Sequence, residues 1–410
     1  MINTVLADIS KYLTVEVLNK ALQVKTCSQD TVKDIEVKRA APAGEGLLSA
    51  VYRVKVTGHH HSASFVVKGL VADPLLRKTL DSNKYFQREV DFFTNIFPVI
   101  SEIQPLQGAK ERISLHIPIC YSSYHNSFDD FILLEDLSES HCRSVSESPS
   151  QEEKNRVLKT IAHFHAVSMA LRIKAPEKFD LITNSLHELY FNEENRNWYS
   201  KYLQNAIDID RNVIAELEEE NSVYYKKFNE ILSQDVYGQY IDALTRPSEH
   251  PVLCHGDSWS PNFLYSKDRM VMIDFQIVRC ASLATDLVYW IMMCSNHNTV
   301  KQDFLDAVDT YYSALDYYLQ DMGLDTSKVF SRTTFDRELK QYGKFGYLAS
   351  LTSLPLMSSE SCDGSISIAE KFPGIDRVPL ERLWNISPIE SKEHKLRLRN
   401  AVRTRHSKIF

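Results

Sequence analysis

The chain has 410 residues, well beyond the roughly 250–300 at which a single hydrophobic core stops growing, so two lobes or domains are expected. Hydrophobic residues make up 43% and charged residues 25%, a globular composition that excludes global disorder. The formal net charge of −7 gives no general attraction to nucleic acid or to an anionic membrane. The seven cysteines are widely spaced and form no C-x-x-C pair, so we expect a reducing, cytoplasmic compartment instead of a disulfide framework.

The first third of the chain is predicted to be mainly strands. Residues 1–22 have the pattern of an amphipathic helix, without the basic start and apolar run of a signal peptide. From about 32 to 137 the pattern is strand-rich, and residues 49–56 and 63–70 are predicted to pair as an antiparallel hairpin. Residues 131–134 form a short apolar run with the length of a buried strand.

The pattern becomes helical after Ser138. Helices are predicted over 151–171, 195–233 and 287–318, short strands at 252–253 and 270–273, a loop at 359–367 and a basic surface helix from 391. A strand-rich front and a helical back predict an α+β fold with two lobes, like that of protein kinases. We expect an N-lobe over 1–136 and a C-lobe over 137–410, with a helical substrate-binding insert at about 186–240.

The strongest motif is His255-Gly-Asp-Ser-Trp-Ser-Pro-Asn262, followed by Asp274-Phe-Gln. Asp257 and Asn262 lie five residues apart on one predicted loop, as in a kinase catalytic loop, and Asp274 ends a short strand. Phosphoryl transfer needs a carboxylate near the attacking hydroxyl and oxygen ligands for Mg²⁺, and this arrangement supplies both. A lone aspartate here would more often cap a turn or pair with an arginine such as Arg279. The three residues together favour a metal–phosphate site.

A phosphate-binding clamp is predicted upstream of this motif. Gly44 and Gly46 precede the hairpin, with Ser49 in the position of a third glycine, and such a loop lets backbone N–H groups approach phosphates. Lys68 ends an apolar strand and needs a partner or an anion, for which Glu89 is the best candidate. The alternative is that Lys68 lies at a strand edge in solvent and Glu89 on a solvated helix face.

The segment Leu133-Leu-Glu-Asp-Leu137 lies where the strand-rich part ends. If this is a kinase hinge, the Glu135 carbonyl and the Leu137 amide are the expected contacts for adenine, although by sequence alone it is only a strand end. His165, on the helix at 151–171, is interpreted as a packed residue and Cys254 as a buried core thiol. Asp286 follows Asp274 by twelve residues and is followed at once by an apolar helix, which leaves no room for a protein-kinase activation segment.

With these motifs the chain resembles the ecdysteroid kinase-like, or CHK-kinase-like, proteins, which belong with choline kinases and aminoglycoside phosphotransferases. The matching segments are 44–54, 66–68, 133–138, 161–166, 253–259, 274–276 and 286–287. The resemblance implies ATP-dependent phosphorylation of a hydroxyl on a steroid or another small alcohol. It also implies that Asp257 is the catalytic base and that Asn262 and Asp274 are the Mg²⁺ ligands. Lys68 would hold the ATP phosphates with Glu89 behind it, and Asp286 would brace the catalytic loop.

The acceptor is the least constrained part of this prediction. The insert is rich in aromatic residues that could form the wall of an apolar pocket or cage a quaternary ammonium, although helix packing is the favoured reading for most of them: Tyr190, Phe191, Trp198, Tyr199, Tyr202, Tyr224 and Tyr225. The acidic residues Glu193, Glu194 and 216–220 are interpreted as solvated. We expect a steroid-like alcohol as substrate, and neither a nucleic acid nor a membrane as partner. A choline/ethanolamine-type kinase and a nucleotide-binding pseudokinase scaffold stay open as alternatives.

Overall fold

The N-terminal lobe is built on a five-stranded antiparallel sheet. The computed structural model describes residues 6–40, 48–294, 300–358 and 368–405. The sheet order is β1-β2-β3-β5-β4, with β1 Val32–Arg39, β2 Ser49–Gly58, β3 Ser62–Leu70, β4 Cys120–Tyr124 and β5 Phe131–Glu135. The predicted hairpin is confirmed, because β2 and β3 pair antiparallel along their length.

Strand β5, between β3 and β4, is buried on both of its faces, which explains its continuous apolar run. Phe131 and Leu133 belong to a core cluster with helix α2 (Val15–Thr26), whereas Ile132 and Leu134 belong to the main core. The helix predicted over 1–22 has the wrong bounds, because the main helix of this part of the chain, α2, spans Val15–Thr26. The Thr14 side chain accepts a hydrogen bond from a backbone N–H of the first turn and so begins α2 at Val15.

The stretch predicted to be strand-rich, 32–137, contains the five strands and also a helical part at residues 74–106. The helical residues form α3 (Pro74–Leu80), α4 (Ser82–Asp91), the π-helical turn η1 (Phe92–Ile96) and α5 (Phe97–Leu106). The aromatic and β-branched residues of η1 suggest a strand by propensity, but they face the main core from a helix. Asp73 caps α3 through two backbone N–H groups and so fixes where this helical stretch begins.

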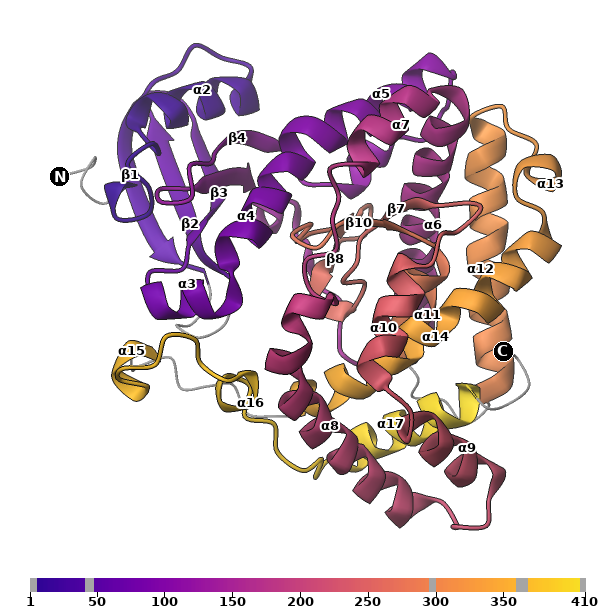
Figure 1. Ribbon diagram of the computed structural model, residues 1–410. Helices are drawn as coiled ribbons and strands as arrows, with labels where there is room; N and C mark the ends of the chain where they lie inside the picture. The colour runs from indigo at the N-terminus through magenta and orange to yellow at the C-terminus, as the bar shows by residue number, and fades with distance from the viewer. Residues whose placement is uncertain (1–5, 41–47, 295–299, 359–367, 406–410) are drawn as a thin grey trace.

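The C-terminal lobe is helical (Figure 1). Its main helices are α6 (Gln151–Lys174), α11 (Ala284–Met293), α12 (Val300–Asp321) and α14 (Arg332–Met357), with short strands β6 (Arg143–Ser144), β7 (Val252–Cys254), β8 (Phe263–Tyr265), β9 (Met270–Met272) and β10 (Arg279–Ala281). Gly346 permits close packing of α14 on α11, because a Cβ there would lie 2.3 Å from the Tyr289 backbone nitrogen. Across the described ranges, every helix is too short or too polar to span a membrane.

The predicted insert is a set of helices. It contains α8 (Arg196–Leu217), α9 (Val223–Leu232) and α10 (Val236–Thr245), and it follows α7 (Pro176–Thr183). The single helical stretch predicted over 195–233 is interrupted, because Ser222 caps a new helix at Val223. Short helical turns complete the fold: η2 Ile113–His116, η3 Leu137–Ser140, η4 Glu193–Asn195, η5 Ser260–Asn262 and α13 Thr326–Val329.

The C-terminal segment returns to the N-lobe before the chain ends. Residues 368–391, here called the strap, contain α15 (Ile368–Lys371) and α16 (Leu380–Leu383) and run beneath α3 (Figure 1). Val378 and Leu383 of the strap form a small core cluster with Leu76 and Leu80 of α3. The strap therefore links the two lobes, whose division at residue 136 stays a prediction.

The last helix, α17 (Lys392–Arg405), begins where the basic surface helix was predicted. It is more than a surface element, because Leu398, Ala401, Val402 and the basic Arg397 are all fully buried. The loop predicted over 359–367 lies outside the described residues.

Phe275 packs at the junction of the two lobes. Its ring stacks on Phe92 of η1 at a centroid distance of 3.8 Å and an interplanar angle of 6°, and it is completely buried. Phe164 of α6 and His255 contact the same ring from the C-lobe side. This aromatic contact therefore fixes the segment that carries Asp274 against the N-lobe helices.

We expect Phe275→Ala to lower the free energy of unfolding by roughly 3–5 kcal/mol, because it leaves a cavity in the main core. Urea denaturation measures this loss. The matched control is Phe128→Ala, whose side chain is exposed and should change stability by less than about 0.5 kcal/mol. Equal, small effects of the two substitutions would contradict the packing described for Phe275.

Candidate active site

A buried ammonium group joins three elements at the centre of the site. Lys68 Nζ on β3 lies 2.8 Å from both carboxylate oxygens of Glu89 on α4, and 2.9 Å from Oδ1 of Asp274. The pairing predicted for Lys68 and Glu89 is thus present, and the solvent-exposed alternative is excluded because Lys68 and Glu89 are buried. Burial alone would lower the pKa of Lys68, but Asp274 and Glu89 outweigh it and raise that pKa, so the group stays charged.

Asp274 has an unusual backbone conformation. Its φ of 69° lies in the left-handed region, which is uncommon for a residue with a side chain, although aspartate adopts it more readily than most. One carboxylate oxygen contacts Lys68, and the other accepts a hydrogen bond of 3.1 Å from Gln276 Nε2. The next residue, Phe275, donates its backbone N–H to Glu89 (3.3 Å) and is held by the aromatic packing described above. The carboxylate orientation is therefore determined from several sides.

Asp257 is held in one orientation by two side chains of its own loop. Asn262 Nδ2 donates to its Oδ2 (2.8 Å) and to its backbone carbonyl (2.9 Å), and Trp259 Nε1 donates to the same Oδ2 at 3.1 Å. Burial and the neighbouring charge of Asp274 raise the pKa of Asp257 to about 7, although these hydrogen bonds oppose the rise. A carboxylate with that pKa exchanges protons near neutral pH.

Asp286, at the start of α11, braces the loop before Asp257. Its two carboxylate oxygens accept hydrogen bonds from the backbone N–H groups of His255 (2.6 Å) and Gly256 (3.0 Å). Gly256 itself has a φ of 87°, and a Cβ there would lie 2.2 Å from the carbonyl oxygen of Ile277, so only glycine fits. Burial would raise the pKa of Asp286, but hydrogen bonding and charge interaction with His165 outweigh it and hold that pKa below its usual value.

His165 and Cys254 are the packed residues that the sequence predicted. The two nitrogens of His165 contact Tyr311 Oη (2.6 Å) and Asp286 Oδ2 (3.2 Å), and Cys254 is fully buried. Ligand atoms of His165, Cys254 and Asp286 lie within 4.8 Å of one another, a spacing that a metal could use. The Asp286 carboxylate already accepts the backbone N–H groups of His255 and Gly256, so we interpret this cluster as a structural brace.

One cavity of about 500 Å³ extends from Asp257 and Asp274 into a chamber with mainly aromatic walls, here called the aromatic chamber. At its polar end it is lined by Ser49, Asp257, Asn262, Asp274 and Gln276. Its other walls are mostly aromatic: Tyr85, Tyr190, Phe191, Trp198, Tyr199, Tyr202, Tyr289, Phe345 and Trp384. The volume is within the range of small-molecule sites.

The aromatic residues of the insert therefore do more than pack helices. Of the seven aromatic residues named from the sequence, Tyr190, Phe191, Trp198, Tyr199 and Tyr202 line the cavity, and Tyr224 and Tyr225 do not. The expected helix packing is also present, because Phe191, Tyr199 and Tyr202 are buried in the main core and the other four pack against it. Several members serve both roles, because Tyr202 is also buried against α14, where its hydroxyl donates to the Thr352 carbonyl.

The remaining predicted nucleotide contacts lie apart from this cavity or outside the described residues. Gly44 and Gly46 are not among the described residues. Glu135 ends β5 at the junction of the lobes, and its carboxylate pairs with Arg269 at 2.7 Å. Leu137 is buried at the start of η3. The assignment of Glu135 and Leu137 to adenine binding stays a prediction.

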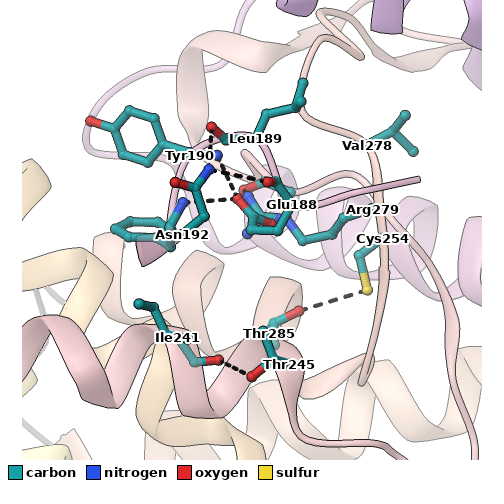
Figure 2. Close-up of polar contacts among 12 residues, drawn as sticks. Glu188, Leu189, Tyr190, Asn192, Ile241, Thr245, Cys254, Val278, Arg279 and Thr285 are labelled. Carbon is teal, nitrogen blue, oxygen red and sulfur yellow. Dashed lines mark hydrogen bonds and ion pairs between the residues drawn. The ribbon is translucent and has the colours of Figure 1, made fainter. Parts of the chain in front are cut away.

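The sequence reasoning missed an ion pair in the wall of the cavity. Arg279 on β10 does not pair with Asp274, the alternative raised from the sequence, because its Nη1 lies 3.0 Å from Glu188 Oε2 (Figure 2). Its Nη2 donates to the Gly256 carbonyl at 3.2 Å. The sequence does contain one indication that Arg279 is buried and paired, since it is the single charged residue in the otherwise apolar segment 277–281.

The residues at the polar end of the cavity suit a divalent cation. Asn262 uses its amide nitrogen to hold Asp257, which leaves its amide oxygen as the ligand atom, and Asp274 supplies a carboxylate oxygen. Carboxylate and amide oxygens are the donors that hard cations such as Mg²⁺ prefer. The amide oxygen of Asn262 and the carboxylate oxygen of Asp274 therefore fit a Mg²⁺ site by their atom type.

A strand-rich lobe and a helical lobe around one polar site form a protein-kinase-like fold. The ecdysteroid kinase-like family matches residues 43–324, and the chain belongs to this family. Among curated protein sequences, none matches the chain.

Several solved kinases resemble the structure at low sequence identity. An ethanolamine kinase from Plasmodium vivax is 13% identical over 81% of this chain and 79% of that chain, with a TM-score of 0.41. A choline kinase from Cryptosporidium parvum is 12% identical over 78% of this chain and 83% of its own, with a TM-score of 0.40. Amicoumacin kinase hAmiN, in complex with AMP-PNP and Ca²⁺, is 14% identical over 93% and 98% of the two chains, with a TM-score of 0.41.

We expect Lys68→Met to lower the free energy of unfolding by roughly 3–5 kcal/mol, because it leaves the Glu89 carboxylate buried without its cation. The double variant Lys68→Met/Glu89→Leu should recover much of this loss, since it removes both charges. Chemical denaturation of both variants measures the difference. Lys55→Met, on the exposed face of β2, is the matched control. A Lys68→Met variant as stable as this control would contradict the buried ion pair.

Proposed function

We propose that the protein transfers the γ-phosphoryl group of ATP to a hydroxyl of a neutral, largely apolar alcohol such as a hydroxylated steroid. The observation that carries this proposal is the single cavity in which Asp257 and Asp274 open onto a mainly aromatic chamber. Family membership supports the reaction type, and the chemistry of the chamber supports the class of acceptor.

In this proposal the chain's residues position the reactants. Lys68, held by Glu89, contacts the ATP phosphates, and Asn262 and Asp274 hold Mg²⁺. The cation, when bound, neutralises charge on the phosphates. Asp257 accepts the proton of the acceptor hydroxyl as the hydroxyl oxygen bonds to the γ-phosphorus and the bond to the ADP oxygen breaks. The orientation of Asp257 by Asn262 and Trp259 supports its role as the base.

The charges around the cavity favour a neutral acceptor over choline. A buried cation needs a carboxylate of its own nearby, and the two that line the cavity, Asp257 and Asp274, are assigned here to the acceptor hydroxyl and to Mg²⁺. Two acidic residues of the insert form ion pairs with other residues, Glu193 with Arg196 and Glu216 with Lys395. The reaction is proposed to take place in the cytoplasm, which agrees with the free thiols of the six described cysteines.

The two aspartates should have separable roles. Asp257→Asn should lower kcat roughly 100- to 10,000-fold while ATP affinity stays near normal, because only proton acceptance is lost. Asp274→Asn should weaken the binding of Mg²⁺–ATP itself. Steady-state kinetics combined with nucleotide-binding titrations distinguish these effects. The exposed Asp268→Asn is the matched control. An Asp257→Asn variant with full turnover would show that another group is the base.

Activity should increase with pH through neutrality. Because the base must be ionised and the pKa of Asp257 is raised to about 7, kcat/KM should fall below that pH and reach a plateau above it. The midpoint for kcat should be lower, since a divalent cation at Asp274 would reduce the repulsion that raises this pKa. Rates measured from pH 5 to 9 test both points. A kcat/KM that is flat across this range would exclude Asp257 as the titrating group.

A competition assay tests the acceptor class. Purified protein is given ATP, Mg²⁺, choline and a hydroxylated steroid, and the two phosphorylated products are quantified by mass spectrometry. We expect saturable phosphorylation of the steroid and little of choline. Phosphorylation of choline without steroid turnover would instead support a choline-type kinase. A lack of ADP release with any alcohol would support a pseudokinase scaffold.

A further inference from the structure

The wall of the aromatic chamber contains a guanidinium group beside the catalytic loop. Arg279 lines the cavity, and its side chain is only 5% exposed. Its Nη2 donates to the carbonyl of Gly256, the residue that precedes Asp257. The charge of Arg279 also acts on Asp257, since it lowers the pKa of that carboxyl against the larger effect of burial. The guanidinium therefore lies close to the place where the attacked hydroxyl must bind.

The hydrogen-bonding capacity of Arg279 is only partly used. A guanidinium has five N–H donors. Within the described part of the chain, Nη2 has one carbonyl acceptor, Nη1 has the Glu188 carboxylate as an ion-pair partner, and Nε is buried without a hydrogen-bond partner. The aromatic ring of Phe345 lies 5.5 Å from the guanidinium and offers no oxygen atom. Nη2 carries two N–H groups and has one acceptor, so its second N–H is the donor that an oxygen atom of a ligand in the cavity would accept from.

The partner of Arg279 determines which oxygen fits. Glu188 is itself fixed, because its Oε1 accepts the backbone N–H groups of Tyr190 (2.8 Å) and Phe191 (3.0 Å), and Figure 2 shows it beside Arg279. The charge of the guanidinium is thus already balanced by Glu188. A second carboxylate would bring an uncompensated negative charge into a buried site that also holds Asp257. A neutral hydroxyl or carbonyl oxygen brings none.

We propose that Arg279 is a specificity-determining residue that binds a second, neutral oxygen of the acceptor, close to the hydroxyl that is phosphorylated. This inference rests on the proposed function and narrows its substrate to alcohols with two neighbouring oxygens, such as vicinal diols. The guanidinium holds the second oxygen, and the attacked hydroxyl is thereby directed to Asp257.

The test compares matched acceptors that differ by one hydroxyl. The probes are estriol against estradiol, and 1-phenyl-1,2-ethanediol against 2-phenylethanol. The ratio of kcat/KM for the diol to that for the mono-alcohol should exceed one in the wild-type protein. Arg279→Lys, which keeps a charge for Glu188, and the neutral double variant Arg279→Gln/Glu188→Gln should each lower this ratio roughly 10- to 100-fold.

The ratio separates specificity from a purely structural effect. Arg88 is a matched control, because it is buried and donates to the carbonyls of Val278 and His187, the neighbours of Arg279 and Glu188, without lining the cavity. Arg88→Lys should lower stability and leave the ratio unchanged. A wild-type ratio near one, or a ratio unchanged in both Arg279 variants, would overturn this inference while leaving the proposed function intact. No turnover of any of the four probes would overturn the proposed function itself.

Discussion

The site depends on one constraint, the ammonium group of Lys68 held between two carboxylates in the interior. Glu89 belongs to an N-lobe helix, Lys68 to the central sheet and Asp274 to the C-lobe, so this contact couples the two lobes at the point where phosphates are proposed to bind. Glu89 is almost completely buried, whereas the Asp274 side chain remains 25% exposed. The difference in exposure suits their proposed roles, since Glu89 orients the lysine and Asp274 faces the ligand.

A second buried carboxylate organises the other half of the site. Asp286 accepts two backbone N–H groups from the residues directly before Asp257 and contacts His165 from behind. The strained backbone at Asp274 and the glycine-only conformation at Gly256 persist because these contacts, and the packing of Phe275, determine the local structure from several directions. The polar end of the cavity is therefore rigid, held by contacts that compensate the backbone strain. The aromatic chamber, in contrast, is formed by side chains from many separate elements.

The parts of the site that could be predicted from sequence are those encoded locally. Asp257 and Asn262 share one loop and Asp274 follows a short strand, so their proximity follows from spacing. Lys68 and Glu89 could be paired because a buried strand lysine needs an anion. The extent of the helices at 74–106 could not be predicted from a stretch that is strand-rich as a whole, because residues such as Phe92 and Ile96 have high strand propensity, which packing against the main core overrides.

The aromatic chamber could not be predicted from local sequence patterns, because it is built from tertiary contacts. Trp384 reaches the cavity from the strap, which crosses back to α3 after a long helical stretch, and no local pattern indicates this return. The pairing of Arg279 with Glu188 joins residues separated by three helices and several strands. The aromatic residues of the insert were visible in the sequence, but the division between those that line the cavity and those that do not depends on how α8 and α9 are placed.

Asp274 and Asn262 are proposed to form a divalent-cation site for ATP next to Lys68, and the whole mechanism depends on this site. The most direct measurement is a thermal-shift titration with ATP, with and without Mg²⁺, on the wild-type protein and on Asp274→Asn. ATP should raise the melting temperature modestly alone and more with Mg²⁺, because a ligand that binds the folded state stabilises it in proportion to its affinity. The increment due to Mg²⁺ should disappear in Asp274→Asn. Equal shifts with and without Mg²⁺ in the wild-type protein would contradict the account.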